Sequence, residues 1–214
     1  MPGRSDRADR ADGTRDLILT SAERLFAEHG VGVVSNRRVG AAAGQGNNFA
    51  VGYHFGAKAE LVRAIIRKHT DHVERIRREM VAEVGDSRDP RDWVACLVHP
   101  TVRHLAESDP PTWFARFGAQ IMTDPALWEI MIEEALSTPS LVRIMDSLNA
   151  TLPVLPVRVR LARNHMARNL IVHMCAEHER ALADGSTDGD WCQLAGDLVD
   201  AIVGLYTASV APGR

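Results

Sequence analysis

Histidine and cysteine are the residues of this sequence most suited to metal binding. There are nine histidines and three cysteines, and both types are common ligands of zinc and related ions. His69 and His72 lie about one helical turn apart and could share a metal ion. Cys96, Cys175 and Cys192 lack the C-x-x-C spacing of zinc sites, so we predict buried, unpaired thiols. A metal-sensing or redox-sensing role through some of these side chains stays open as an alternative.

Known catalytic motifs are absent from the sequence. It contains no Glu-x-x-His or His-Glu-x-x-His pattern, which helical di-iron proteins and zinc proteases use, respectively. It also lacks the GxxxxGK phosphate loop and the GxSxG nucleophile motif. We therefore predict no catalytic residue, no cofactor and no metal site. A helical metalloenzyme is kept as an alternative that bound metal in the purified protein would reveal.

Side chains suited to DNA contacts lie close together in the first third of the chain. Arg37 and Arg38 follow Ser35, and Asn47 and Asn48 follow a glycine-containing turn. Arginine binds phosphate, and the paired donor and acceptor of an asparagine amide match adenine in the major groove. An asparagine at such a position can equally be no more than a helix cap.

The distribution of charge supports this reading more than the net charge of −3 does. The segment from Ser35 to Arg78 holds nine basic and three acidic residues. The rest of the chain is correspondingly acidic. A basic segment attached to an acidic body is typical of a DNA-binding head.

Apolar residues recur at three- and four-residue steps almost everywhere, and no long run alternates with period two, so we predict an all-α fold. Serine, asparagine, proline and glycine residues suggest where the helices begin and end. The expected helices are Thr14–His29, Asn36–Ala43, Asn47–His54, Lys58–Val84, Pro90–Glu107, Pro111–Met122, Pro125–Ser137, Pro139–Asn149, Val157–Ala183 and Asp188–Ser209.

These elements suggest three parts. Residues 1–13 are polar, with no apolar segment for a signal peptide, and are expected to form a disordered tail. In residues 14–57, two short helices joined by a glycine-containing turn follow the first helix, which is the minimum for a helix-turn-helix. Residues 58–214 form a long connecting helix and a helical bundle. No stretch reaches the roughly 20 apolar residues of a membrane span, so we expect a cytoplasmic protein.

The segment from Thr14 to Ala64 resembles the DNA-binding region of the TetR (tetracycline repressor) family of transcriptional regulators. The most specific part is Tyr53-His54-Phe55, with Lys58 and Leu61 following at the expected spacing. It comes after Arg38-Val39 and Ala43-Gly44, which match the helix before it. The stretch from Gly44 to Tyr53 is about two residues longer than is usual, with Gln45 in place of a small apolar residue. The extra residues lengthen either the turn or the second helix of the motif.

The resemblance implies roles for particular residues. Tyr53 and Lys58 are expected to contact phosphate, and Arg37 and Arg38 to contact phosphate or the groove edge. His54 is expected either to reach the DNA backbone or to pack on the first helix. The expected DNA-binding set is Arg37, Arg38, Gln45, Asn47, Asn48, Tyr53, His54 and Lys58.

The resemblance also implies an effector pocket in the body and a homodimer formed through the last two helices. Large apolar side chains between residues 93 and 131 could line the pocket, or could equally be filled core. The candidates are Trp93, Trp113, Phe117, Trp128 and Met131. The predicted function is that of a repressor that binds a palindromic operator in double-stranded DNA and is released by a small molecule. A DNA-binding module without an effector stays open.

Overall fold

The computed structural model describes residues 4–47, 49–109 and 112–210, and these residues form α-helices and their connections, with no β-strand among them. The all-α prediction is confirmed. The helices are α1 (Arg4–His29), α2 (Asn36–Ala42), α3 (Ala50–Phe55), α4 (Lys58–Val84), α5 (Pro90–Glu107), α6 (Phe114–Ile121), α7 (Pro125–Leu136), α8 (Pro139–Thr151), α9 (Val157–Ala183) and α10 (Trp191–Thr207). None of the helices in the described ranges is long and apolar enough to cross a membrane.

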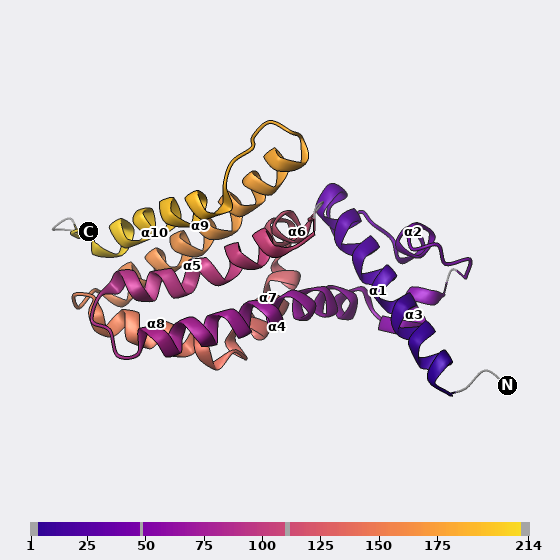
Figure 1. The fold of residues 1–214 in the computed structure, drawn as a ribbon, viewed down its shortest axis with the longest axis horizontal. Coiled ribbons are helices and arrows are strands. Elements are labelled where there is room, and N and C mark those ends of the chain that lie inside the picture. Colours follow the sequence, from indigo (N-terminus) through magenta and orange to yellow (C-terminus); the bar gives the residue numbers. More distant parts are fainter. Residues whose placement is uncertain (1–3, 48, 110–111, 211–214) are drawn as a thin grey trace.

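The helices are arranged as a small head and a larger body (Figure 1). Helices α1, α2 and α3 form the head at one end of the molecule, and the bundle of α5 to α10 forms the body. The long helix α4 packs against α1 and α3 in the head and against α5, α7 and α8 in the body. Helix α4 is therefore packed in both the head and the body and connects them.

Four helix starts follow from local capping chemistry. The Ser35 hydroxyl accepts the backbone N–H of Arg38 at 3.2 Å, which starts α2 where the sequence predicts it. Asp89, Asp124 and Asp190 cap α5, α7 and α10 in the same way. Each of these side chains satisfies a backbone N–H that has no partner within its helix, a contribution of about 1 kcal/mol per cap.

The starts of α1 and α6 are among those that differ from the sequence-based expectation. Helix α1 begins at Arg4 rather than near Thr14, so the expected tail is helical from Arg4 onwards. Helix α6 begins at Phe114, whereas Pro111, its expected first residue, lies outside the described residues. The start of α6 depends on a distant residue. The Glu179 carboxylate from α9 accepts the backbone N–H groups of Ala115 and Arg116 at 3.2 and 3.0 Å.

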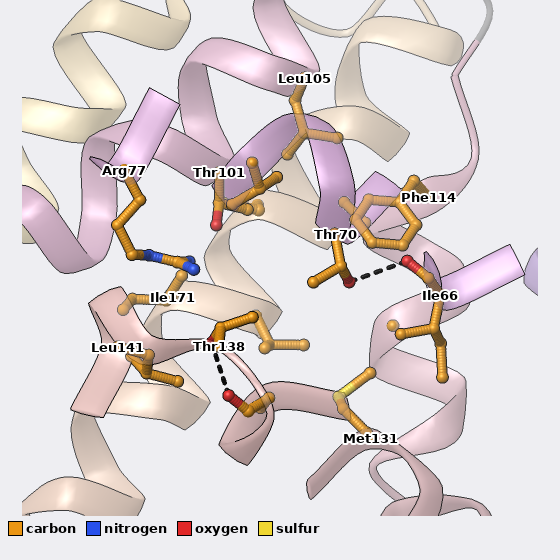
Figure 2. Close-up of a pocket in the computed structure, with 16 residues that line it drawn as sticks. Ile66, Thr70, Arg77, Thr101, Leu105, Phe114, Met131, Thr138, Leu141 and Ile171 are labelled. Atoms are coloured by element: carbon orange, nitrogen blue, oxygen red, sulfur yellow. Dashed lines mark hydrogen bonds between the residues drawn. The ribbon is translucent and has the colours of Figure 1, made fainter. Parts of the chain in front are cut away.

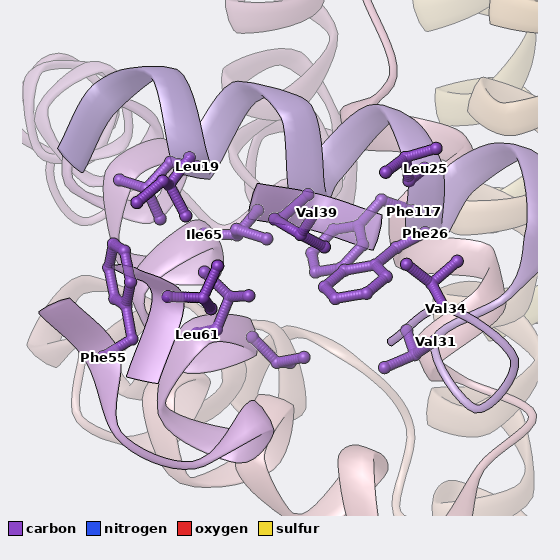
Figure 3. Close-up of a cluster of buried hydrophobic side chains, with 14 of the residues drawn as sticks. Leu19, Leu25, Phe26, Val31, Val34, Val39, Phe55, Leu61, Ile65 and Phe117 are labelled. Atoms are coloured by element: carbon purple, nitrogen blue, oxygen red, sulfur yellow. The ribbon is translucent and has the colours of Figure 1, made fainter. Parts of the chain in front are cut away.

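The apolar core of the head extends into the body (Figure 3). Leu61 and Ile65 of α4 belong to the same buried cluster as Phe26 and Val39 of the head. Phe117 of α6, fully buried, stacks against Phe26 with ring centroids 6.2 Å apart. The expected division at residue 58 therefore does not separate the apolar core of the head from the body, because α4 and α6 contribute side chains to both.

Candidate DNA-binding face and ligand cavity

Helices α2 and α3 form the compact two-helix unit expected of a helix-turn-helix. They are joined by a turn in which Gly44 has a φ of +68°, a conformation that glycine adopts at little cost. The Gln45 backbone N–H donates to the Gly40 carbonyl, and its side-chain amide donates to the Ala43 carbonyl. Val39 and Val51 pack inward from the two helices. The arrangement fixes α3 relative to α2 and leaves its other side exposed.

The second helix of the motif begins later than expected. It starts at Ala50 rather than near Asn47, so Gln45 and Asn47 lie in the preceding turn. The Asn47 side chain accepts the backbone N–H of Phe49 at 2.9 Å and stabilises that turn locally. The extra residues of this segment therefore lengthen the turn and not the helix. Asn48, the other expected base-reading residue, lies outside the described residues.

Two aromatic side chains stand out on the free side of α3. Tyr53 is 86% exposed and Phe49, one turn before it, is 79% exposed. Exposure of two large rings is costly unless they meet a partner, so this face is suited to binding. Sequence reasoning identified Tyr53 but missed Phe49, although the four-residue spacing places both on one side of a helix.

Cationic side chains surround this face. Arg37 is exposed, and the guanidinium of Arg38, also exposed, pairs with the His29 ring at 2.6 Å. The Lys58 ammonium donates to the Val31 carbonyl at 3.0 Å, which ties the start of α4 to the loop before α2 and leaves two N–H groups for phosphate. The half-buried His54 lies against Tyr53, with ring centroids 5.2 Å apart.

Arg15 is a further cation near this face that sequence reasoning missed. It is exposed on α1 and donates to the His54 carbonyl at 3.2 Å. Its guanidinium lies 4.4 Å from the centre of the Phe55 ring. The repeating apolar pattern of α1 gave no sign that Arg15 would reach α3, because this contact depends on the crossing of two helices.

His69, one of the two histidines singled out in the sequence, belongs to a partly buried hydrogen-bonded chain, whereas His72 contacts Arg75 and Glu107. His69 contacts Glu23 of α1 at 2.9 Å and His104 of α5 at 2.7 Å. Burial, with the nearby charges of His69 and His72, lowers the pKa of His104 to about 4. In the part of the chain that the structure describes, no group of three His, Cys, Asp or Glu side chains is placed to hold a metal ion. These histidines instead link the head to the body.

The three cysteines are free thiols, as expected. Burial raises the pKa of Cys175 to about 12 and that of Cys96 to about 11. Redox chemistry requires the thiolate, so these two side chains are poorly suited to sensing oxidants. Cys192 is exposed. The cysteines therefore give little support to a redox-sensing function.

An apolar cavity of about 190 Å³ lies inside the body, immediately behind the head (Figure 2). Side chains from α4, α5, α6, α7, α8 and α9 line it, mostly apolar ones. The wall includes Ile66, Leu105, Phe114, Met131, Leu141 and Ile171. Phe114 and Met131 also pack against the core cluster of the head. A molecule in this cavity would thus touch side chains that support the helix-turn-helix.

Of the five residues expected at an effector site, only Met131 lines this cavity. Trp113 lines a neighbouring hollow beside His69 and His104. Trp93 and Phe117 are buried in the two cores, and Trp128 is covered by the Arg168 guanidinium at 3.9 Å. Size and hydrophobicity do not distinguish a cavity wall from filled core, so the sequence could not separate these cases.

A buried charge at the cavity was missed from the sequence. Arg77 is only 8% exposed and lines the cavity, and it pairs with Glu74 at 3.1 Å. It lies four residues after Val73 and eleven after Ile66, both buried on α4. A cation in the buried stripe of a helix is rare. The position of Arg77 in the apolar pattern of α4 could therefore have indicated a buried charge.

Two family models match the chain. Residues 18–65 match the model described as bacterial regulatory proteins of the tetR family. Residues 95–204 match the tetracyclin repressor-like C-terminal domain. No curated protein matches the sequence significantly.

Solved structures with the same fold include a mutant of the HlyIIR protein that carries a linker with two thrombin sites. It is 16% identical, with a TM-score of 0.53, and the match covers 92% of this chain and 99% of that one. A γ-butyrolactone receptor described as an ArpA-like protein is 19% identical, with a TM-score of 0.37 and coverage of 92% and 83%.

The HlyIIR likeness extends to the head and the body together, and so it supports the fold of the whole chain. The C-terminal model alone spans just over half of the sequence, and the N-terminal model spans the helix-turn-helix. This chain therefore belongs to the tetR family of DNA-binding transcriptional regulators.

Proposed function

We propose that this protein is a repressor that binds an inverted-repeat operator as a homodimer and releases it when a small molecule enters the body. One observation carries the proposal. Phe114 and Met131 line the cavity and also pack against the core cluster of the head, so that filling the cavity would disturb the support of the DNA-binding head. A regulator with no effector would gain nothing from a hollow at this place.

At the DNA, α3 enters the major groove and the cations around it bind phosphate. Tyr53, Arg37 and Lys58 hold the backbone, together with Arg38 and His54. Base edges are met by the turn before α3, where Gln45 and Asn47 lie, and by the first turn of the helix. Asn48, which is outside the described residues, stays an expected base-reading residue. Since Asn47 already accepts the Phe49 N–H through its side-chain oxygen, its amide N–H₂ is the group that faces a base acceptor.

Release follows from a shift between two conformations of the dimer. A ligand that fits the cavity only when α4 and α6 have moved stabilises a state in which the two α3 helices are wrongly spaced. Half-sites on DNA are one helical turn apart, so a small change in this spacing weakens both contacts together.

Selection of bound sequences from a pool of random duplexes by the purified full-length protein tests the proposal. We expect an enriched inverted repeat. The Arg37→Ala variant should bind that repeat more weakly at every sequence position and reduce the salt dependence by about one phosphate contact per half-site. The Glu79→Ala variant, exposed on α4 and outside the last two helices, serves as a control. Failure of the wild-type protein to enrich any repeat at low salt would contradict the proposal.

A further inference from the structure

The polar end of the cavity is a guanidinium whose hydrogen bonding is incomplete. Arg77 Nη1 donates to Glu74 Oε2 at 3.1 Å, and the same oxygen accepts the Ser140 hydroxyl. Arg77 Nε is buried and has no hydrogen-bond partner. Burial lowers the pKa of Arg77 even though Glu74 acts to raise it. The ion pair with Glu74 therefore does not fully offset the cost of removing this cation from water.

The rest of the wall offers a ligand little beyond apolar contact. The Thr70 hydroxyl donates to the Ile66 carbonyl within α4, and the Thr138 hydroxyl, just before α8, donates to the Ala135 carbonyl of α7. Thr101 contributes the remaining threonine hydroxyl of the wall. Among the buried polar atoms without a partner in the described ranges, only Arg77 Nε belongs to a side chain that lines this cavity. Figure 2 shows the guanidinium of Arg77 pointing toward the middle of the cavity, with Ile171 beside it and Phe114 and Met131 on the opposite side.

We propose that the effector is a small amphipathic carboxylate whose anionic head is bound by Arg77 and whose apolar body fills the space toward Phe114 and Met131. This inference rests on the proposed function, because it names the ligand of the cavity that the repressor would use. A carboxylate matches the planar fork of a guanidinium and supplies the acceptor that the buried Nε of Arg77 lacks. An alcohol supplies no charge, and an ammonium group would be repelled.

The size of the cavity limits the apolar part. Its volume of about 190 Å³ compares with the roughly 150 Å³ of an engineered dry cavity that binds benzene. An unbranched acid of about eight carbons or a phenylalkanoic acid of similar size is therefore the expected scale. Longer acids fit only if α6 or α7 moves, which is the movement that release of DNA would require.

Calorimetric titration of the purified full-length protein is the direct test. The probes are hexanoate, octanoate, decanoate and 4-phenylbutyrate, each compared with its own alcohol and its own primary amine at pH 7.5. We expect at least one acid to bind saturably and at least tenfold more tightly than the alcohol of equal length, with the amine weaker still. If no acid is preferred over its alcohol, the inference is overturned, whether or not the alcohols bind.

Two sets of variants assign the preference to Arg77. The double variant Arg77→Met, Glu74→Gln removes the ion pair as a unit, so no uncompensated buried charge is left. It should bind acid and alcohol within twofold of each other. Glu74→Gln alone keeps the guanidinium and removes the competing carboxylate, so it should bind the acid at least as tightly as the wild-type protein. Retention of the tenfold preference by the double variant would overturn the role of Arg77.

A third variant reports on the cavity independently of Arg77. A Cβ added at Gly118, which lines the cavity, meets no atom within 4 Å, so a side chain can leave the backbone here without a clash. We expect Gly118→Leu to occupy cavity space, and circular dichroism checks that the variant folds. We expect it to abolish acid binding. Unchanged affinity would place the ligand elsewhere and overturn the inference.

The DNA-binding assay separates this inference from the proposed function. If the protein enriches an inverted repeat but shows no preference for acids, the carboxylate inference fails and the repressor proposal stands. If acids bind through Arg77 but no repeat is enriched, the carboxylate inference holds and the repressor proposal fails.

Discussion

At the scale of single residues, the DNA-binding surface and the interior of this protein require opposite degrees of exposure from their side chains. Around α3, aromatic rings and cations are exposed. They can contact DNA only while they remain accessible. In the body and at its junction with the head, the polar side chains of Glu23, His69, Arg77 and Glu179 are nearly fully buried. Glu23 and His69 contact each other, Arg77 pairs with Glu74 of the same helix, and Glu179 pairs with Arg116. Because a buried polar group without a partner is costly, these four sites are where single substitutions should have the largest effects.

Phe49 offers a test of base recognition at the start of α3. An exposed ring at this place is suited to contact with the methyl group of a thymine. We expect Phe49→Ala to weaken binding to the selected operator about fivefold, roughly 1 kcal/mol, through one base pair per half-site. The measurement is binding to a panel of operators substituted one position at a time. Val33→Ala, a similarly exposed apolar side chain in the loop before α2, is the control and should leave every position unchanged.

His104 gives the folded protein a defined pH dependence. Its pKa is about 4 in the folded chain, against about 6.5 when unfolded. As the pH falls from about 6.5 toward 4, the unfolded chain takes up a proton here that the folded chain does not. The contribution of His104 to stability is therefore fully present above this window and decreases within it.

We expect the wild-type protein to lose about 1 kcal/mol more stability than His104→Gln between pH 7.5 and pH 5, after allowance for solvent screening of a half-exposed group. Urea unfolding at the two pH values measures the difference, in which the titration of distant groups cancels. Equal losses in the two proteins would show that His104 is solvated in the folded state.

At the scale of helices, local chemistry determined what could be predicted. The long helices α4, α5 and α9 begin and end where the apolar pattern and the proline and glycine residues predicted. The errors occur where a distant contact or an unusual turn decides. Helix α6 begins at the residues capped by Glu179 of α9, and α3 begins only after the turn held by Asn47. The apolar periodicity of the sequence gives no information about either of these contacts between a side chain and the backbone.

The candidate site shows the same limit. The helix-turn-helix is a local unit, so its outer face was largely predictable from one segment of sequence. The cavity is bounded by six helices spread from residue 66 to residue 175. Which of its large apolar side chains face a void depends on how well neighbours fill the space, and that is not encoded in residue type alone. Arg77 is the cavity residue that could have been identified from the sequence, because a charged residue is unusual in the buried apolar stripe of a helix.

A substitution at Glu179 tests the contribution of α6, a helix that joins the body to the head. It is 2% exposed and holds the first turn of α6 through two backbone N–H groups and the Arg116 side chain. Glutamine keeps the size but brings an amide N–H₂ to donors that need an acceptor. We expect Glu179→Gln to reduce the free energy of unfolding by about 2 kcal/mol. Urea denaturation measures the loss, and Glu177→Gln, exposed on the same helix, should unfold like the wild-type protein.

At the scale of the whole molecule, a single chain exposes more apolar surface on α9 than it needs for its own bundle. Leu161 and Met166 are 51% and 52% exposed on this helix, and Ala201 and Gly204 face outward on the neighbouring α10. Small residues permit close approach of helices, and large ones supply the buried area that association requires. A second copy packed on this surface through a twofold axis would also set the distance between the two α3 helices.

We therefore expect the protein to have twice the mass of its 23.5 kDa chain in solution, and the double variant Leu161→Glu, Met166→Glu to be monomeric. Acidic side chains on both copies would have to be buried together at the twofold contact, so the interface should fail while the monomer stays folded. Sedimentation analysis and circular dichroism measure the two properties.

Because two linked heads bind a repeat far more tightly than one, the monomer should lose affinity for the inverted repeat and keep only its weak binding to a single half-site. Val142→Glu, at a 45% exposed position on α8, introduces the same charge outside the last two helices and should leave both mass and DNA binding unchanged. A dimer that survives the double variant would move the interface away from this face of α9. The spacing between half-sites would then have to be set by another surface of the body.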